Sequence, residues 1–320
     1  MQFPKGKEFY HGELHRGLPI ARLNSGKAAI YHAFRVTGCR TIWLPFYQCD
    51  TIRLFFRKHG IEPKYYRIDR YFNPIDLTPA ADEAVLLVNY YGVMSAARLE
   101  ALADRYSNVV IDNCQAFFAE PLPDCQNVYS CRKFIGVPDG AYVIGKGADR
   151  YQSDYPLCYS SDTAVFLLQR IEYGCEGRAY ESRGVNERRV EEEDVMRMSK
   201  LTHAILDGTD YAEIIQKRRD NFSTAHELLG KFNSIDAMQY MDSSTVPMVY
   251  PLVAESDELL PVLLKHKHFQ GHWWSYLCDE LPADYAEHWL SRYTIPITID
   301  QRYGRRELEY LAGIIASVLE

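Results

Sequence analysis

The stretch Val109-Val110-Ile111-Asp112-Asn113-Cys114-Gln115 decides the fold of this chain. Its three consecutive β-branched apolar residues predict a strand buried on both faces, as in parallel sheets. Asp112 ends this strand, and open α/β sheets bind ligands at the carboxyl ends of their strands. An aspartate that only starts a turn is the alternative. Because an unpaired carboxylate is costly to bury, Asp112 is a candidate for binding a charged group.

Similar apolar runs flank this stretch on both sides and alternate with amphipathic segments. Further strands are predicted at Thr41 to Pro45, Tyr65 to Ile68, Val85 to Val88, Val128 to Cys131 and Ala141 to Ile144. Helices are predicted after Gly26, from Cys49 to Lys58, and near Ala96 to Tyr106. This alternation is typical of an α/β fold, with a mostly parallel central sheet covered by helices on both faces.

The second half of the chain has a different pattern. Residues 151–196 are polar and charged, and we expect them to be irregular. A long helix near 212–232, a strand near 248–253 and a helix near 306–319 then predict a smaller C-terminal α+β domain. We therefore expect two domains, a large one over residues 1–205 that includes an N-terminal arm, and a small one over residues 206–320.

The segment Asn24-Ser25-Gly26-Lys27 opens the first predicted helix. Helix N-termini offer free N–H groups and the positive end of the helix dipole, so a glycine there permits close approach of a phosphate. A serine cap without a ligand is the alternative. The segment matches neither a complete G-x-G-x-x-G fingerprint nor a P-loop, which argues against dinucleotide or ATP binding of those types.

A lysine follows another predicted strand in Tyr129-Ser130-Cys131-Arg132-Lys133. A lysine amine held in a cleft can form a Schiff base with a carbonyl compound. An exposed loop lysine is one alternative. Another is a serine hydrolase of the penicillin-recognising kind, with Ser130 and Lys133 as nucleophile and base, but the Lys-Thr-Gly motif of that class is absent from the chain.

These three segments together match the requirements of a pyridoxal phosphate site. The phosphate requires backbone donors, the pyridine nitrogen requires an anion, and the aldehyde requires a lysine. Gly26, Asp112 and Lys133 would supply them in that order.

The chain resembles the DegT/DnrJ/EryC1/StrS family of sugar aminotransferases, which are pyridoxal phosphate-dependent enzymes of fold type I. The matching segments occur in the family's order over about residues 20 to 305: Leu23 to Ala29, Trp43 to Cys49, Ile111 to Ala116, Tyr129 to Lys133, Arg197 to Ser199, Lys217 to Arg219 and Ile297 to Tyr303. Lys27, the Asn89-Tyr90-Tyr91-Gly92 segment and the short spacing between Ser130 and Lys133 depart from the family's pattern.

The resemblance implies a role for each site residue. Gly26 and Lys27 would donate backbone N–H groups to the phosphate, and Ser25 and Ser130 would add hydroxyls. Asp112 would pair with the pyridine nitrogen, Gln115 would lie by the phenolic oxygen, and Lys133 would hold the cofactor as a Schiff base and move a proton. The family places an aromatic ring over the cofactor, where this chain has Cys49, and Tyr47 is the substitute that we consider.

The resemblance also implies the substrates and the assembly. An amino group would pass from an amino acid such as glutamate to a keto-sugar attached to a nucleotide, within a homodimer. Tyrosines and arginines in residues 151–196 suit an interface, with Arg178, Arg183 and Arg188 as candidates for reaching across to a phosphate or sugar. The alternatives are another pyridoxal phosphate reaction on the same scaffold, or a degenerate member with a binding or structural role.

Composition excludes several other classes. Hydrophobic residues make up 47% and charged residues 25% of the chain, as in soluble globular proteins, and a net charge of -7 argues against nucleic acid as a partner. No apolar stretch approaches a membrane span and no signal peptide is visible, so we expect no membrane partner. The eight cysteines form no C-x-x-C pair, which indicates a cytoplasmic protein without a metal site.

Overall fold

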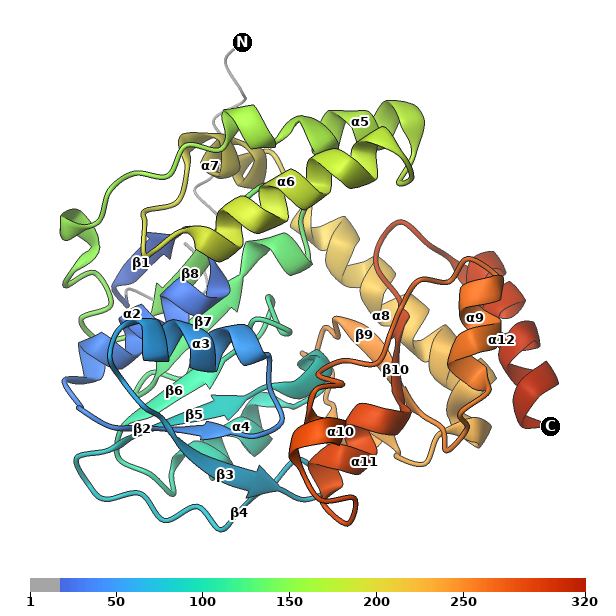
Figure 1. Cartoon of the computed structure of the whole chain (residues 1–320), viewed down its shortest axis with the longest axis horizontal. Helices are drawn as coiled ribbons and strands as arrows, with labels where there is room; N and C mark the ends of the chain where they lie inside the picture. Colours follow the sequence, from blue (N-terminus) through green and yellow to red (C-terminus); the bar gives the residue numbers. More distant parts are fainter. Residues whose placement is uncertain (1–17) are drawn as a thin grey trace.

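An eight-stranded sheet forms the centre of the larger part of the molecule in the computed structural model, which describes residues 18–320 (Figure 1). Residues 1–17, where the predicted N-terminal arm begins, lie outside the described part. Strand order across the sheet is β1-β8-β7-β6-β5-β2-β3-β4. Its strands are β1 (Ile20–Leu23), β2 (Ile42–Pro45), β3 (Lys64–Ile68), β4 (Pro74–Ile75), β5 (Ala84–Val88), β6 (Val109–Asp112), β7 (Gln126–Ser130) and β8 (Ala141–Ile144).

The five central strands β3, β2, β5, β6 and β7 are parallel to one another, whereas β8, β1 and β4 join by antiparallel pairing. Every residue of β5 and β6 is buried, which is why β5 and the first three residues of β6 appear in the sequence as apolar runs. The prediction of a mostly parallel sheet is therefore confirmed. Because these strands are parallel, their carboxyl ends meet at one edge of the sheet.

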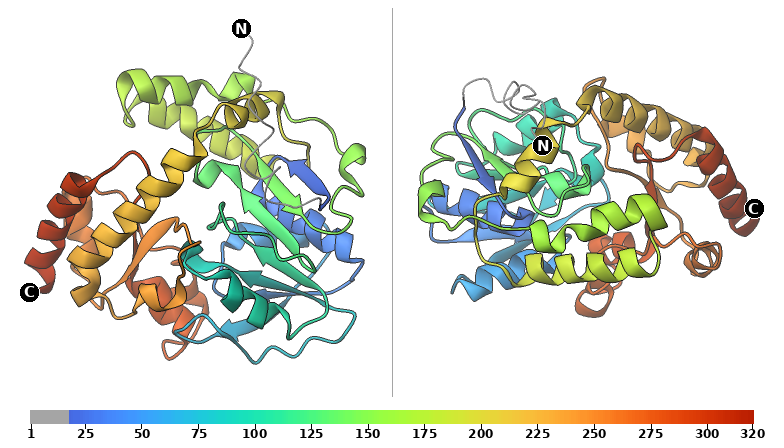
Figure 2. Two further views of the ribbon diagram at one scale, coloured as in Figure 1. Left: turned by 180° about the vertical axis from the view of Figure 1, so that it is seen from behind. Right: turned by 90° about the horizontal axis from the view of Figure 1, so that it is seen from above.

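Helices cover both faces of this sheet, as the sequence predicts. α2 (Gly26–Thr37) and α3 (Asp50–Lys58) lie in front of it in Figure 1, and α4 (Ala96–Ala103) is in front when the view is reversed in Figure 2. α2 begins after Ser25, whose hydroxyl accepts from the N–H of Ala28, and ends at Gly38 in the left-handed conformation. The start of α2 lies at the edge of the sheet where the parallel strands end, since Gly26 closely approaches Cys114 and Ser130 after β6 and at the end of β7.

Residues 151–196 are not irregular, so this expectation was wrong. After short 3₁₀ turns at Gln152–Asp154 and Ser161–Thr163, they form α5 (Val165–Tyr173) and α6 (Arg178–Glu192). The two helices pack along each other as a hairpin, whose far end projects beyond the sheet (Figures 1 and 2). α6 has only three buried residues, Ala179, Asn186 and Val190, so its sequence lacks the apolar stripe by which helices are recognised.

α7 (Lys200–Asp207) lies beside β1 and β8 of the larger part (Figure 1), and the hydroxyl of its Thr202 donates to the carbonyl of Asp139 at 3.4 Å. The later elements surround a small two-stranded sheet of β9 (Val249–Val253) and β10 (Thr294–Thr298). The helices of this region are α8 (Tyr211–Leu229), α9 (Leu259–Lys265), α10 (Leu277–Glu280), α11 (Ala286–Tyr293) and α12 (Arg305–Leu319). A smaller α+β part thus follows the large sheet. The division between residues 205 and 206 stays a prediction.

The two strands of the small sheet pair antiparallel, with Pro251 directly opposite Pro296. Asn233 lies along the outer edge of β9, where its amide donates to the carbonyl of Pro251 at 2.8 Å and its oxygen accepts from the N–H of Val253 at 3.0 Å. On β10, the carbonyl of Thr294 lies 3.0 Å from Nδ1 of His272. Side chains therefore bind backbone groups on both outer edges of this sheet.

Within residues 18–320, no helix has the length and apolar character needed to cross a bilayer. All eight cysteines lie in this part of the chain, and none forms a disulfide.

Candidate active site

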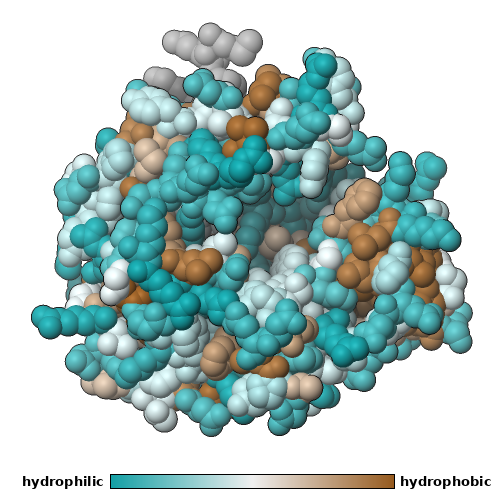
Figure 3. All heavy atoms as spheres, in the orientation of Figure 1, coloured by the Kyte–Doolittle hydropathy of each residue, from teal (hydrophilic) through white to brown (hydrophobic). Residues whose placement is uncertain are grey.

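A cavity of about 440 Å³ lies at the carboxyl edge of the parallel strands. In the space-filling view a recess opens near the centre of the face, beneath α6 and beside the small sheet (Figure 3). The structure brings eight of the nine sequence-predicted site residues together in the cavity wall: Ser25, Gly26, Lys27, Cys49, Asp112, Gln115, Ser130 and Lys133. Only Tyr47 does not line it.

The N-terminus of α2 forms one wall of the cavity. Gly26 is the first residue of the helix, and the N–H groups of a first helical turn have no partner within the helix. A Cβ atom on Gly26 would lie 3.0 Å from Sγ of Cys114 and 3.9 Å from Cβ of Ser130, so glycine permits this close approach to the ends of β6 and β7. Gly26, Lys27 and Ser130 all line the cavity at this point.

The side chain of Lys27 has another role. Its ammonium donates to the carbonyl of Glu191 on α6 and lies 5.1 Å from the ring centre of Phe55. Burial lowers the pKa of Lys27, and the positive charge of Lys58 acts in the same direction. Lys27 therefore lines the cavity while its side chain ties α2 to α6.

Asp112 and Gln115 present polar groups beneath the cavity. Asp112 is only 7% exposed, and one of its oxygens accepts from the N–H of Cys114 at 2.9 Å. The side-chain oxygen of Gln115 accepts from the N–H of Tyr91 at 2.7 Å. Since an N–H can bond only to the oxygen of that amide, the Gln115 nitrogen is left to donate elsewhere. Burial, with the charge of Asp112, raises the pKa of the neighbouring Cys114 thiol well above its usual value, so this thiol stays neutral.

Lys133 ends a 3₁₀ turn, Cys131–Lys133, that follows β7 directly. The turn is fixed because the N–H of Cys131 donates to the carbonyl of Gly140 at 3.0 Å and the N–H of Phe134 donates to that of Cys131 at 3.1 Å. Among residues 18–320, the Lys133 ammonium has no hydrogen-bond or ion-pair partner. A lysine that lines a cavity without a partner is free to react with a bound carbonyl group.

Tyr47 is fully buried below the cavity, where its hydroxyl bonds to that of Tyr91. Burial raises the pKa of Tyr47 well above its usual value. The aromatic residue that lines the cavity is instead Trp274, which packs edge-on against Tyr47 with 4.5 Å between ring centres. Sequence reasoning missed Trp274, because it lies in the loop before α10, outside every matching segment.

Gln48 is a second cavity residue to which sequence reasoning gave no role. The available signal was weak: a polar residue shortly after the end of a predicted strand, between Tyr47 and Cys49.

α6 forms the outer wall of the cavity through residues spaced at helical intervals, Arg183, Glu187, Val190 and Glu191. It is held by an ion pair of 2.5 Å between Arg132 and Glu187 and by the bond from Lys27 to Glu191. Arg183, a candidate for reaching across to a partner's site, therefore lines the cavity of its own chain.

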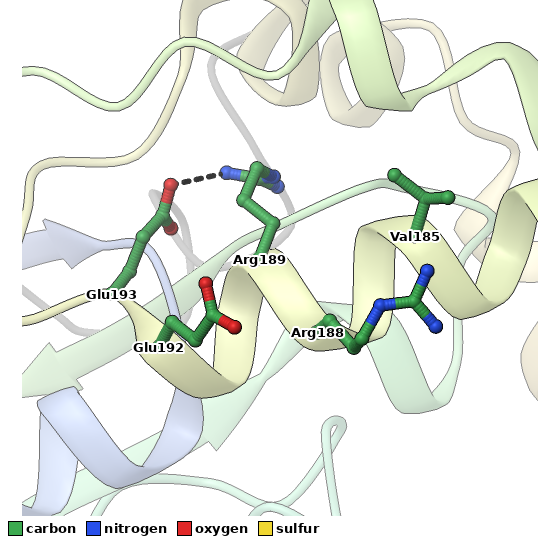
Figure 4. Close-up of a pocket in the computed structure, with 5 residues that line it drawn as sticks. All are labelled: Val185, Arg188, Arg189, Glu192 and Glu193. Carbon is green, nitrogen blue, oxygen red and sulfur yellow. Dashed lines mark hydrogen bonds and ion pairs between the residues drawn. The ribbon is translucent and has the colours of Figure 1, made fainter.

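A second hollow lies along α6 and is lined by Val185, Arg188, Arg189, Glu192 and Glu193 (Figure 4). Arg189 turns toward Glu193 and forms a 2.7 Å ion pair with it. Arg189 also donates to the carbonyl of Pro138 at 3.3 Å. Arg188 lies in this hollow rather than in the candidate site.

The donor set of the main cavity fits pyridoxal phosphate. Backbone N–H groups and two serine hydroxyls suit a phosphate, a buried carboxylate suits a protonated pyridine nitrogen, and an unpaired lysine suits an aldehyde. Within residues 18–320 no group of three or more histidine, cysteine, aspartate or glutamate side chains is arranged to hold a metal ion.

Comparison with solved structures identifies the fold. No family model and no curated protein matches the sequence. The sugar aminotransferase CalS13 of Micromonospora echinospora aligns with 96% of this chain and 89% of its own, at 15% identity and a TM-score of 0.66. A DegT DnrJ EryC1 StrS aminotransferase of Brucella abortus aligns with 99% and 92%, at 12% identity and a TM-score of 0.63.

A third neighbour is the GDP-4-keto-6-deoxy-D-mannose-3-dehydratase of Escherichia coli with bound hydrated pyridoxal phosphate. It aligns with 95% of this chain and 90% of its own, at 12% identity and a TM-score of 0.62. The chain therefore has the fold of pyridoxal phosphate-dependent transferases of type I, as the sequence predicts. Within that class, its structural neighbours include sugar aminotransferases of the DegT/DnrJ/EryC1/StrS type.

Proposed function

We propose that this protein is a pyridoxal phosphate-dependent aminotransferase that acts on a keto-sugar attached to a nucleotide. The observation that carries the proposal is the convergence of Gly26, Asp112 and Lys133 on one cavity. These residues come from α2, β6 and the turn after β7, and the chain shares its fold with sugar aminotransferases. A degenerate binding protein would have no need to keep all three.

Each residue has a defined task in this proposal. The N–H groups of Gly26 and Lys27 and the hydroxyls of Ser25 and Ser130 bind the phosphate at the helix N-terminus. Asp112 would keep the pyridine nitrogen protonated, and the amide nitrogen of Gln115 would donate to the phenolic oxygen. When bound, pyridoxal phosphate supplies an electron sink for carbanion chemistry. The amine of Lys133 would hold the cofactor covalently and would move the substrate proton.

The names of the structural neighbours support the substrate class. They include sugar aminotransferases and a dehydratase of a GDP-linked keto-sugar. By analogy, the amino donor would be an amino acid such as glutamate and the acceptor a nucleotide-linked keto-sugar. Another pyridoxal phosphate reaction on the same scaffold is the alternative, and the dehydratase is an example of one.

The proposed assembly is a homodimer. Exposed apolar side chains gather on the α5–α6 hairpin, with Leu168 67%, Ile171 83%, Tyr173 60% and Tyr180 69% exposed. Large apolar side chains grouped on one surface mark interaction sites. A second copy of the chain packed on this hairpin would bury them beside the cavity wall that α6 provides.

Covalent mapping tests the proposal. The purified chain is loaded with pyridoxal phosphate, reduced with borohydride and digested, and mass spectrometry should find a pyridoxyl group on Lys133. Lys133→Ala should lose this adduct, while Lys146→Ala, outside the cavity wall, should retain it. An adduct confined to another lysine would contradict the assignment.

Single-turnover measurements then test the reaction. The loaded protein should release 2-oxoglutarate from glutamate, and Asp112→Asn should slow this release by at least 100-fold because the lost charge acts where carbanion charge develops. A protein that binds pyridoxal phosphate but does not release 2-oxoglutarate would favour a different pyridoxal phosphate reaction. A protein that does not bind pyridoxal phosphate at all would favour a degenerate member of the fold, with a binding or structural role.

A further inference from the structure

Gln48 has a buried amide that no protein group satisfies. The residue is only 2% exposed, and neither its side-chain oxygen nor its nitrogen has a hydrogen-bond partner. Among the described residues that line the cavity, Gln48 alone has buried side-chain polar atoms without partners. A buried polar group left unsatisfied is costly, so such a group inside a cavity indicates a missing ligand.

The backbone of Gln48 is fixed on both sides. Its N–H donates to the carbonyl of Phe46 at 2.9 Å, and its carbonyl accepts from the hydroxyl of Tyr276 at 2.8 Å. Tyr276 is held in turn, because the guanidinium of Arg53 lies 4.5 Å from its ring centre and pairs with Glu280 at 2.6 Å. The backbone that carries this amide is therefore held at the cavity wall, in part by the loop that also carries Trp274.

The two unsatisfied atoms limit the chemistry of the ligand. The amide nitrogen requires an acceptor and the amide oxygen requires a donor. Phosphate and carboxylate oxygens only accept, so neither the phosphate of a cofactor nor the carboxylate of an amino acid satisfies both atoms. A hydroxyl group both donates and accepts. Trp274, in the same cavity wall, adds an aromatic surface on which the C–H face of a sugar ring can pack.

We propose that Gln48 and Trp274 form the wall that recognises the sugar ring of the substrate, with the Gln48 amide bonded to a sugar hydroxyl. This inference rests on the proposed function. It adds to that function the residues that select an acceptor with a sugar hydroxyl over one without. A site that buries such a polar group discriminates strongly against ligands that lack the hydroxyl, because the amide is then left unpaired.

Binding measurements on the full-length, cofactor-loaded protein test this inference. Calorimetry compares dTDP-glucose and GDP-mannose with their nucleoside diphosphates, dTDP and GDP, for the wild type, Gln48→Leu and the nearly isosteric Gln48→Met. We expect both variants to bind at least one nucleotide sugar about 10- to 100-fold more weakly, because one ligand hydrogen bond is lost. Affinity for the nucleoside diphosphate should stay within about twofold.

The matched control is Gln169→Leu. Gln169 on α5 also has a buried side-chain oxygen without a partner, but it does not line the cavity. The Gln169→Leu variant should bind the nucleotide sugars and the nucleoside diphosphates as the wild type does. Unchanged nucleotide-sugar affinity in both Gln48 variants would overturn the inference, as would a wild type that binds neither nucleotide sugar better than its diphosphate.

Cofactor loading is measured in parallel by visible absorbance and should be equal in the wild type and both Gln48 variants. Loss of loading in the variants would assign Gln48 to the cofactor instead and overturn the inference. Failure of the proposed function is distinguishable, because it would appear as absence of the Lys133 adduct in the wild type.

Discussion

Arg132 and Glu187 form an ion pair, with 2.5 Å between Nη2 and Oε1, that joins the residue before Lys133 to the middle of α6. Glu187 also lies 3.7 Å from Arg183, one turn earlier on α6. The outer wall of the cavity is therefore tied to the turn that carries the proposed catalytic lysine. Movement of α6 and access to Lys133 should be coupled.

Removing this ion pair should loosen α6. We expect Glu187→Ala to accelerate backbone hydrogen exchange in residues 178–192, while exchange in α2 stays unchanged. The pair is partly exposed, so the free energy of unfolding should fall by only about 1 kcal/mol or less. Glu181→Ala on the same helix is the control, since Glu181 has no ion pair among the described residues. Equal exchange in both variants would argue against an anchoring role.

Gly92 should tolerate no side chain. Its φ of +72° favours glycine, and an added Cβ would lie 2.2 Å from the carbonyl oxygen of Gln115. Gly92→Ala should lower the free energy of unfolding by about 3 kcal/mol or more, measured by urea denaturation. Gly60→Ala provides the comparison, because Gly60 has a φ of +73° with no atom within 4 Å of the added Cβ. Gly60→Ala should lower the free energy of unfolding by only the conformational penalty, about 1–2 kcal/mol.

Stability should fall below neutral pH because of His32. This side chain is fully buried, with Nε2 at 2.6 Å from the carbonyl of Ala148 and Nδ1 at 2.9 Å from the hydroxyl of Tyr155. Burial lowers the pKa of His32 below its usual value of 6.5. The unfolded chain therefore binds a proton that the folded chain does not as the pH falls below 6.5.

The direction in which stability changes with pH follows from this difference in protonation. His32 should not affect the pH dependence of stability above pH 6.5, and should make stability fall from pH 6.5 downward until the folded pKa is reached. Urea denaturation between pH 8 and pH 5 should show a shallower decline for His32→Gln than for the wild type. Parallel curves for the two proteins would contradict this assignment.

The exposed face of α5 should hold the proposed dimer together. Sedimentation of the wild type should give about twice the 37.0 kDa mass of the chain, and Leu168→Glu with Ile171→Glu should shift it toward the monomer. Leu264→Glu on α9, where Leu264 is 44% exposed, is the control and should leave the mass unchanged. A wild type that remains monomeric at micromolar concentration would exclude this interface.

The sequence predicts the centre of the fold because local pattern and burial coincide there. Val109 to Ile111 and Val85 to Val88 are apolar throughout, and both lie in central parallel strands. β1 was missed because Arg22 interrupts its apolar residues, and β10 because Pro296 lies within it. Both strands depend on pairing with distant segments.

The candidate site could be predicted where it follows strand ends and a helix start. Asp112, Ser130 and Gly26 are such positions, and the parallel sheet brings them together. Trp274 and the face of α6 could not be predicted, because their place in the cavity depends on packing across more than 50 intervening residues. Tyr47 was a plausible ring residue from spacing alone, but its side chain points into the core.

The facing prolines of the small sheet have a consequence for aggregation. A two-stranded sheet has two open edges that could pair with strands of other molecules. Pro251 and Pro296 lack the N–H groups that a third strand would need at the middle of either edge, and Asn233 already binds the backbone of β9. This part of the chain is thereby protected against strand addition from neighbouring copies during folding, independently of what binds in the cavity.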